Sequence, residues 1–404
     1  MQKIEKSLHS VLAYAERNHF IGYNKYDALD SPLLNVLSFG NKWIRLVYSQ
    51  VVMRSPINIR PLLAVPKTIN PKGFGLFAST YLNLYKHYKE EKYLNQAEYF
   101  LNWLIENPSP TYPKRAWGYQ HPWQDVGFFA PANLPNRVVT YFVCSAFLDA
   151  FEATQDEKYL HQVEQALDFL LNDPNVIYED ETMKCLSYVP DRSVDWVVMD
   201  VSALTATITS RFIYLKGKQS KYSKQLEQAT KLIRYVVDKQ TDYGAWWYSH
   251  PPKAHSKMHD NYHTGYICDS ILHYSKFSGN DEFMSAYHTG IEYYRDHLFL
   301  KDGTPKWMNN AVYPLDVHGS AQGIISFSKA SQFDITYLDL AKTIAEWAIH
   351  NMQHPTEGYF YYQKTKYFKK PFTLMRWSNG WMARALSDLI QVQSKQSKLS
   401  LSSK

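Results

Sequence analysis

The sequence repeats a pair of helical segments about every 60 residues, and this period constrains the fold more than any other feature of the chain. The first segment of each pair is rich in small residues and poor in charge, as in DVSALTATITSRFIYLK from Asp200. The second has apolar residues at helical spacing and a charged face, as in EKYLHQVEQALDFLLND from Glu157. The pattern therefore predicts repeated helical hairpins rather than unrelated domains.

The two kinds of helix predict two layers. The small-residue helices suit an inner ring that is buried all round, and the amphipathic helices suit an outer ring with one face in water. The last inner helix, from Arg376, has no outer partner after it, and the N-terminal helix at residues 2–18 has none before it. Pairing these two closes the ring without polar capping repeats. We predict an all-α fold, an (α/α)6 toroid of six hairpins.

The domain boundaries follow from this pairing. We expect a single toroid domain over residues 1–392 and a disordered polar tail over residues 393–404, where the composition is Ser, Lys and Gln with few apolar residues. The predicted inner helices begin near Gly73, Arg137, Asp200, Asn261, His318 and Arg376.

Short aromatic segments with Gly or Pro beside them connect most outer helices to the next inner helix. Their composition predicts short β-hairpins at the N-terminal end of the inner helices, which forms the mouth of the toroid. Aromatic rings at such a mouth can stack on sugars. The candidates for this role from these segments are Trp117, Tyr119, His121, Trp246, Tyr248 and Tyr361.

Titratable residues from different hairpins coincide at this mouth. Counting back five residues from Gly265 and Gly323, at matching positions of two inner helices, gives Asp260 and His318, and Asp200 has the same place within one residue. Several such groups converging in one pocket are typical of an active site. The catalytic candidates are Asp200, Asp260, His263 and His318. The further binding candidates are Asn261, Tyr262, Asp316, Gln322, Arg376 and Trp377.

The stretch HDNYHTGY at residues 259–266 allows other interpretations. His259 and His263 are four residues apart, like the two zinc ligands of H-E-x-x-H, but no third ligand is evident, so we expect no metal. Asp200 and Asp260 could also be simple helix N-caps, and His318 a hydrogen-bonded structural residue.

Composition excludes several function classes. The net charge of +6 is spread out with no basic block, so we expect no nucleic-acid partner, and it favours an acidic ligand only slightly. No apolar run is long enough to span a membrane. The 3 cysteines form no CxxC pair, which favours a reducing, cytoplasmic location. Since no phosphate-binding glycine loop is present, we expect no nucleotide and no other cofactor. The oligomeric state is left open.

Several stretches resemble a known family. SPINIRPLLAVPKTINPKGFGLF, HDNYHTGY, YPLDVHGSAQGI, GYFYYQ and MRWSNGWMARAL are similar to signatures of a six-hairpin family encoded in bacterial exopolysaccharide and capsule clusters. The resemblance extends from about Tyr23 to Leu389. It implies the six-hairpin glycosidase-like superfamily, whose members include glycosidases, unsaturated uronyl hydrolases, sugar 2-epimerases and polysaccharide lyases. A carbohydrate substrate is what the resemblance implies, whereas the candidate residues come from the sequence pattern.

Two chemistries fit these candidates. Glycoside hydrolysis needs a carboxylic acid and a carboxylate, which Asp200 and Asp260 would supply. A uronate lyase or sugar epimerase needs a base near neutral pKa, such as His263 or His318 with Tyr262, and a neutralising group such as Arg376 or Asn261. We favour hydrolysis of a surface polysaccharide or its oligosaccharides. A non-catalytic sugar-binding or scaffold protein of polysaccharide assembly is the third possibility.

Overall fold

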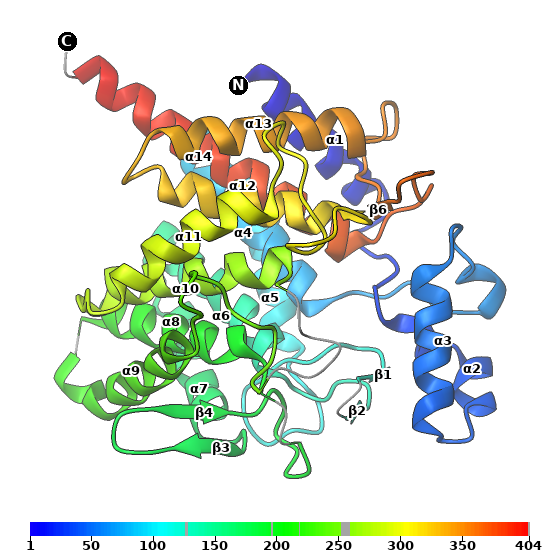
Figure 1. Ribbon diagram of the computed structural model, residues 1–404, viewed down its shortest axis with the longest axis horizontal. Helices are drawn as coiled ribbons and strands as arrows, with labels where there is room; N and C mark the ends of the chain where they lie inside the picture. Colours follow the sequence, from blue (N-terminus) through cyan, green and yellow to red (C-terminus); the bar gives the residue numbers. More distant parts are fainter. Residues whose placement is uncertain (126–127, 195–196, 218, 252–258, 403–404) are drawn as a thin grey trace.

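Six inner helices form a closed ring in the computed structural model, which describes residues 1–125, 128–194, 197–217, 219–251 and 259–402 (Figure 1). Each inner helix packs on the next, and α14 packs back on α4. The inner helices are α4 (Pro71–Tyr88), α6 (Arg137–Thr154), α8 (Met199–Lys216), α10 (Asn261–Ser278), α12 (Val317–Ala330) and α14 (Trp381–Ser402), the last preceded by a π-helix at Met375–Gly380.

The outer helices cover this ring. They are α5 (Glu91–Glu106), α7 (Glu157–Asn172), α9 (Ser223–Asp238), α11 (Met284–Leu298), α13 (Thr336–Met352) and α1 (Gln2–Arg17). The N-terminal helix α1 packs on α14 and α13, at the opposite end of the chain. The predicted (α/α)6 toroid is therefore confirmed. The first five inner helices begin within two residues of the predicted positions, and the π-helix that leads into the sixth begins one residue before the predicted Arg376.

Burial explains the two rings. Every residue of α8 from Met199 to Ile213 is buried, which suits its small and apolar side chains. In α9 only one stripe is buried, which includes Ala229, Leu232 and Val236. The inner helix thus packs on neighbours from all sides, whereas the outer helix keeps one face in water.

Three antiparallel strand pairs occur among the described residues, all in connections that lead to inner helices. Two are hairpins within one connection, and the third joins the connections that lead to α12 and α14. They pair β1 (Trp123–Gln124) with β2 (Phe129–Ala130), β3 (Val176–Glu179) with β4 (Lys184–Leu186), and β5 (Leu315–Asp316) with β6 (Gln363–Lys364). The β3–β4 hairpin lies outside the aromatic segments that predicted hairpins, whereas the segment around Trp246 forms only an isolated bridge, between Val198 and Ser249.

Two parts of the chain differ from the expected boundaries. The helix α14 continues to Ser402, so the tail expected to be disordered from residue 393 is helical up to that point. Between α1 and α4 the chain leaves the ring and forms α2 (Pro32–Leu37) and α3 (Lys42–Arg54), which stand beside the toroid (Figure 1). They enclose a small separate core of Ala28, Leu34 and Val52.

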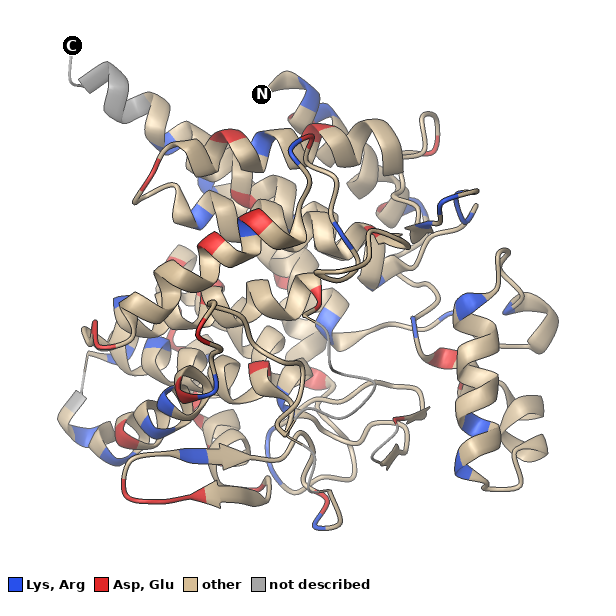
Figure 2. Cartoon of the chain, in the orientation of Figure 1, with Lys and Arg blue, Asp and Glu red and all other residues tan. Residues whose placement is uncertain are grey.

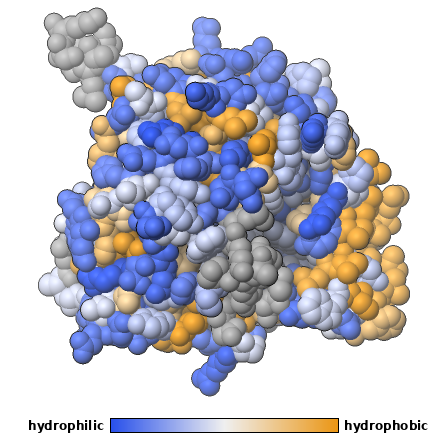
Figure 3. Space-filling view, viewed as in Figure 1, coloured by the Kyte–Doolittle hydropathy of each residue, from blue (hydrophilic) through white to orange (hydrophobic). Residues whose placement is uncertain are grey.

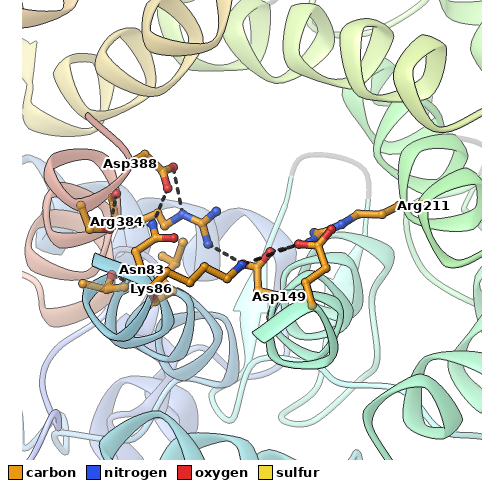
Figure 4. A network of polar contacts seen from close by, with 10 residues as sticks. Asn83, Lys86, Asp149, Arg211, Arg384 and Asp388 are labelled. Atoms are coloured by element: carbon orange, nitrogen blue, oxygen red, sulfur yellow. Dashed lines mark hydrogen bonds and ion pairs between the residues drawn. The ribbon is translucent and has the colours of Figure 1, made fainter. Parts of the chain in front are cut away.

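The far end of the ring, at the C-terminal ends of the inner helices, is held by a buried ionic network (Figure 4). Asp149 on α6 accepts hydrogen bonds from Arg211 on α8 at 2.6 Å and from Arg384 on α14 at 2.8 Å. Arg384 also contacts Asp388, which binds Asn83 of α4. One carboxylate thus ties inner helices from three hairpins together.

Neither membrane-spanning helices nor disulfides are found among the described residues. In the part of the chain that the structure describes, no helix is long and apolar enough to cross a bilayer. Cys144, Cys185 and Cys268 are buried free thiols.

Candidate active site

A cavity of about 320 Å³ opens at the N-terminal end of the inner helices. Polar residues of the inner helices reach it from five hairpins: Lys72 from α4, Asp200 from α8, His263 from α10, His318 from α12 and Arg376 from the π-helix before α14. The repeat brings these side chains together because each lies at the start of an inner helix, and these starts meet at the mouth. Polar groups converging from several elements in an aromatic-walled pocket are the usual features of a ligand site.

Ten of the sixteen candidate residues line this cavity. All four catalytic candidates do so, namely Asp200, Asp260, His263 and His318, together with the binding candidates Tyr119, His121, Tyr248, Tyr262, Arg376 and Trp377.

The other six candidates lie elsewhere. Trp117 and Trp246 are core residues whose indole N–H groups donate to the carbonyls of Leu104 and Val236 on outer helices. Tyr361 packs partly buried against the core. The remaining three are engaged in structural hydrogen bonds: Asn261 with Leu298 and Tyr294, Gln322 with Asp269 and Ser326, and Asp316 with Gln363 and Trp377.

Asp260 and His263 form a close pair in the first turn of α10. Asp260 Oδ2 lies 2.8 Å from His263 Nδ1, and Asp260 Oδ1 accepts a hydrogen bond from the backbone N–H of His263 at 3.0 Å. Burial alone would raise the pKa of Asp260, but the charge and hydrogen bonds of His263 outweigh it and lower that pKa. Burial opposes charge on His263 too, yet Asp260 and Asp200 raise the pKa of the imidazole. The pair therefore favours carboxylate and imidazolium.

Asp200 has the opposite electrostatic setting. It is the second residue of α8 and does not cap that helix, whose N-cap is Val198. Burial raises the pKa of Asp200 and the nearby charge of Asp260 adds to the effect, while His263 and Lys72 oppose it. Its Oδ1 atom is buried with no hydrogen-bond partner among the described residues. These conditions favour a protonated carboxyl.

His318 is enclosed by aromatic rings. Its ring stacks on Tyr262 with centroids 4.6 Å apart and on Trp381 at 4.5 Å, and its Nε2 lies 2.7 Å from the hydroxyl of Tyr266. Burial, reinforced by nearby cations, holds its pKa well below the usual range, so the imidazole is neutral. Its Nδ1 is buried and has no hydrogen-bond partner within the described ranges.

Arg376 brings a buried cation to the cavity wall. It is 3% exposed, and its Nε and Nη1 atoms have no hydrogen-bond partner in the described part of the chain. Its guanidinium lies 5.3 Å from the ring centre of Tyr119 and 5.2 Å from that of Trp377. Unpartnered guanidinium donors beside a cavity are suited to an anionic ligand group.

Sequence reasoning missed several residues around the cavity. Lys72 lines it, and burial holds the pKa of its amine well below normal. Lys25 lies behind Trp377, with Nζ 3.7 Å from the ring centre and 3.8 Å from Asp316 Oδ2, and burial lowers its pKa to about 8. Lys72 follows the inner-helix pattern and could have been found from it. Further lining residues that were missed are Tyr26, Trp123, Asp125, Tyr188, Tyr266 and Trp307.

His259 and His263, whose spacing resembles that of two zinc ligands, have other partners. His259 Nδ1 lies 2.7 Å from the carbonyl oxygen of Trp246, and its Nε2 lies 3.0 Å from the hydroxyl of Tyr243. His263 is held by Asp260. Over the described ranges, no cluster of three or more His, Cys, Asp or Glu is arranged to hold a metal ion.

The fold of this chain, a closed ring of six helical hairpins, can be compared with those of known proteins. No family model and no curated protein matches the sequence. Solved structures do match the fold. A family 76 α-mannanase from Bacteroides thetaiotaomicron has a TM-score of 0.63 at 14% identity, covering 84% of this chain and 90% of its own.

Two further solved structures are similar over most of their length. The cellobiose 2-epimerase of Spirochaeta thermophila has a TM-score of 0.61 at 12% identity, covering 81% of this chain and 87% of its own. An unsaturated glucuronyl hydrolase specific for heparin has a TM-score of 0.61 at 10% identity, covering 83% of this chain and 90% of its own. At these identities the likeness shows the shared fold.

Proposed function

We propose that this protein is a carbohydrate-active enzyme that hydrolyses a glycosidic bond. The observation that carries the proposal is one cavity holding two acidic side chains whose pKa values are shifted in opposite directions, upward for Asp200 and downward for Asp260. Hydrolysis of a glycoside needs one protonated and one ionised carboxyl group at the scissile bond. The surroundings of the two side chains therefore assign Asp200 as the protonated acid and Asp260 as the ionised base.

In the proposed reaction, Asp200 donates its proton to the leaving oxygen as the glycosidic bond breaks. Asp260 accepts a proton from water, whose hydroxyl bonds to the anomeric carbon. After product release Asp260 gives this proton to solvent and Asp200 takes one up, so both carboxyl groups return to their starting states. The imidazolium of His263 keeps Asp260 ionised until it accepts that proton. Aromatic side chains of the cavity wall, such as Tyr119, Tyr248 and Trp377, offer faces on which sugar rings stack.

An acidic saccharide suits this cavity best. The unpartnered donors of Arg376 are placed to bind a uronate carboxylate or another anionic substituent. The resemblance to proteins of exopolysaccharide and capsule clusters supports a bacterial surface polysaccharide, or oligosaccharides from it, as the source of the substrate. The free thiols support the proposal of a cytoplasmic location.

His318 favours a second candidate function. A neutral imidazole with an unpartnered Nδ1 can accept a proton from carbon, and Arg376 can neutralise an adjacent carboxylate, which are the requirements of a uronate lyase or a sugar epimerase. The similar fold of the cellobiose 2-epimerase supports this alternative only as an analogy.

Mass spectrometry separates the candidates. The protein is incubated with oligosaccharides from the polysaccharide of its own gene cluster. Hydrolysis adds one water per bond cleaved and is lost in Asp200→Asn, whereas a lyase yields an unsaturated product without added water. An epimerase leaves the mass unchanged and alters the NMR spectrum. Binding with none of these changes would contradict the proposal and indicate a non-catalytic sugar-binding or scaffold protein.

A further inference from the structure

Exposed apolar side chains gather on the two helices beside the toroid, α2 and α3. We define the α2–α3 surface as Leu33, Val36, Leu37, Phe39, Trp43, Val47 and Val51. Phe39 is 82% exposed, Val36 is 73% exposed and Trp43 is 66% exposed. Apolar side chains gather over these helices in the space-filling view, at the right of the molecule (Figure 3). Exposed apolar surface of this extent indicates an interaction site.

The helix α3 has an apolar face that is exposed to solvent and a second face that packs on a core. Trp43, Val47 and Val51 are four residues apart and therefore lie along one face. The opposite side of the helix buries Val52 in the small core beneath it, and Ser49 is also buried. The exposed apolar face is thus not a by-product of poor packing, because α3 has a separate core-facing side.

Charge decides between the possible partners. Residues 31–64, which contain both helices, include no Asp or Glu, and their charged residues are Lys42, Arg45, Arg54 and Arg60. Arg60 is buried against Asp27, while Lys42 and Arg54 are exposed. Basic residues mark α3 at several places along its length (Figure 2). A two-fold contact between copies would place these like charges near one another. An anionic lipid surface, in contrast, complements both the basic residues and the Trp, Phe, Leu and Val side chains.

We propose that the α2–α3 surface docks this protein on an anionic membrane surface, with Phe39, Trp43 and Val47 entering the interface and Lys42 and Arg54 contacting lipid headgroups. The docking element is also a wall of the cavity, because Leu46, Ser49 and Gln50 of α3 line it. Docking therefore holds the candidate active site beside the lipid surface. The inference goes beyond the proposed reaction and stands whichever carbohydrate chemistry the cavity performs.

Vesicle sedimentation tests the proposal with the full-length protein. Vesicles contain phosphatidylglycerol and phosphatidylethanolamine, or phosphatidylcholine alone as the neutral comparison, in about 0.15 M salt. We expect binding to the anionic vesicles that is reduced at least tenfold in the triple variant Phe39→Ser, Trp43→Ser, Val47→Ser. Lys42→Gln combined with Arg54→Gln should weaken anionic binding and reduce its dependence on salt.

A matched control removes apolar side chains exposed elsewhere. The variant Leu300→Ser, Phe333→Ser, Ile335→Ser should bind vesicles like the unmodified protein, since these residues lie far from α2 and α3 in the sequence and pack in other hairpins. Unchanged melting temperatures verify that all variants are folded. No binding to anionic vesicles, or equal binding by both triple variants, overturns the proposal. Self-association that is lost only in the α2–α3 variant also overturns it and assigns the surface to a second copy.

Discussion

Asp260 caps the helix that carries its own ionic partner: the carboxylate accepts a hydrogen bond from the backbone N–H of His263 and lies 2.8 Å from Nδ1 of the same residue. The sequence allows either helix capping or a catalytic role for this aspartate, and in the structure the capping carboxylate also lines the cavity. The cap fixes the carboxylate at the mouth, and the imidazole sets its charge. Asp200 differs, since it lies in the cavity wall and caps nothing.

Replacing Asp260 by Asn separates the two roles. Asn caps a helix about as well as Asp, but it carries no charge and accepts no proton. We expect turnover to fall at least about 10²-fold. Unfolding free energy should fall by less than about 2 kcal/mol, because His263 can lose its proton instead of remaining a buried charge. Turnover and thermal unfolding are measured on the same samples.

Asp156→Asn is the matched control. Asp156 caps the outer helix α7 by accepting a hydrogen bond from the N–H of Lys158 at 2.9 Å, and it does not line the cavity. It should keep normal turnover. If Asp260→Asn behaves like this control, Asp260 is only a cap and the assignment of the site is wrong.

The Asp260–His263 pair also predicts a pH dependence. The pKa of His263 is raised, so its contribution to stability is fully present below the unfolded pKa of about 6.5 and is lost as the pH rises through the folded pKa. The pKa of Asp260 is lowered, so its contribution is lost as the pH falls through that folded pKa. The difference in unfolding free energy between the unmodified protein and His263→Gln should shrink above the folded pKa of His263. A difference that stays constant from about pH 5 to pH 9 would contradict the pairing.

Arg376→Met should improve stability while damaging binding. Two buried guanidinium donors without partners destabilise the folded protein, so their removal should raise the unfolding free energy by about 1 kcal/mol. The same variant should raise KM for an acidic oligosaccharide at least about tenfold. KM for a neutral analogue should be little changed. A lower melting temperature with an unchanged KM for the acidic substrate would show that Arg376 is a packing residue.

The repeat made most of the fold predictable because each hairpin needs the same pattern of burial. Small residues at inner positions and amphipathic outer helices follow from packing alone, and the start of α10 at Asn261 and of α6 at Arg137 could be located from it. The same register placed Asp200, Asp260 and His318 in the cavity wall. Repetition therefore predicted those parts of the site that the inner helices supply.

What does not repeat could not be predicted in the same way. Lys25 and Tyr26 reach the cavity region from an irregular segment whose path depends on tertiary contacts. The protrusion of α2 and α3 has no counterpart in the other hairpins as far as their residues are described. Aromatic composition also could not distinguish residues that line the cavity from residues of the core. Tyr119 lines the cavity, whereas Trp117, two residues earlier, is buried and its indole N–H donates a hydrogen bond to an outer helix.

The ionic network at the far end of the ring provides the last prediction (Figure 4). Asp149 lies between Arg211 and Arg384, so Asp149→Asn leaves two buried guanidinium groups short of one negative charge, with Glu152 and Asp388 as their remaining partners. Removing one partner of a buried ion pair typically lowers the unfolding free energy by about 3–5 kcal/mol. The variant should lose unfolding free energy of this order, since the network joins inner helices from three hairpins.

Asp339→Asn is the control for this network, because its ion pair with Lys342 is exposed and should be worth less than about 1 kcal/mol. Acidification adds a second test. Burial would raise the pKa of Asp149, but Arg211 and Arg384 outweigh it and hold that pKa far below its usual range. Its stabilisation is therefore present above the unfolded pKa of about 3.9 and is lost as the pH falls through the folded pKa. The difference in unfolding free energy between the unmodified protein and Asp149→Asn is measured by chemical denaturation. This difference should be constant near neutral pH and should become smaller below about pH 4. If Asp149→Asn loses no more unfolding free energy than Asp339→Asn does, the network does not stabilise the ring of helices.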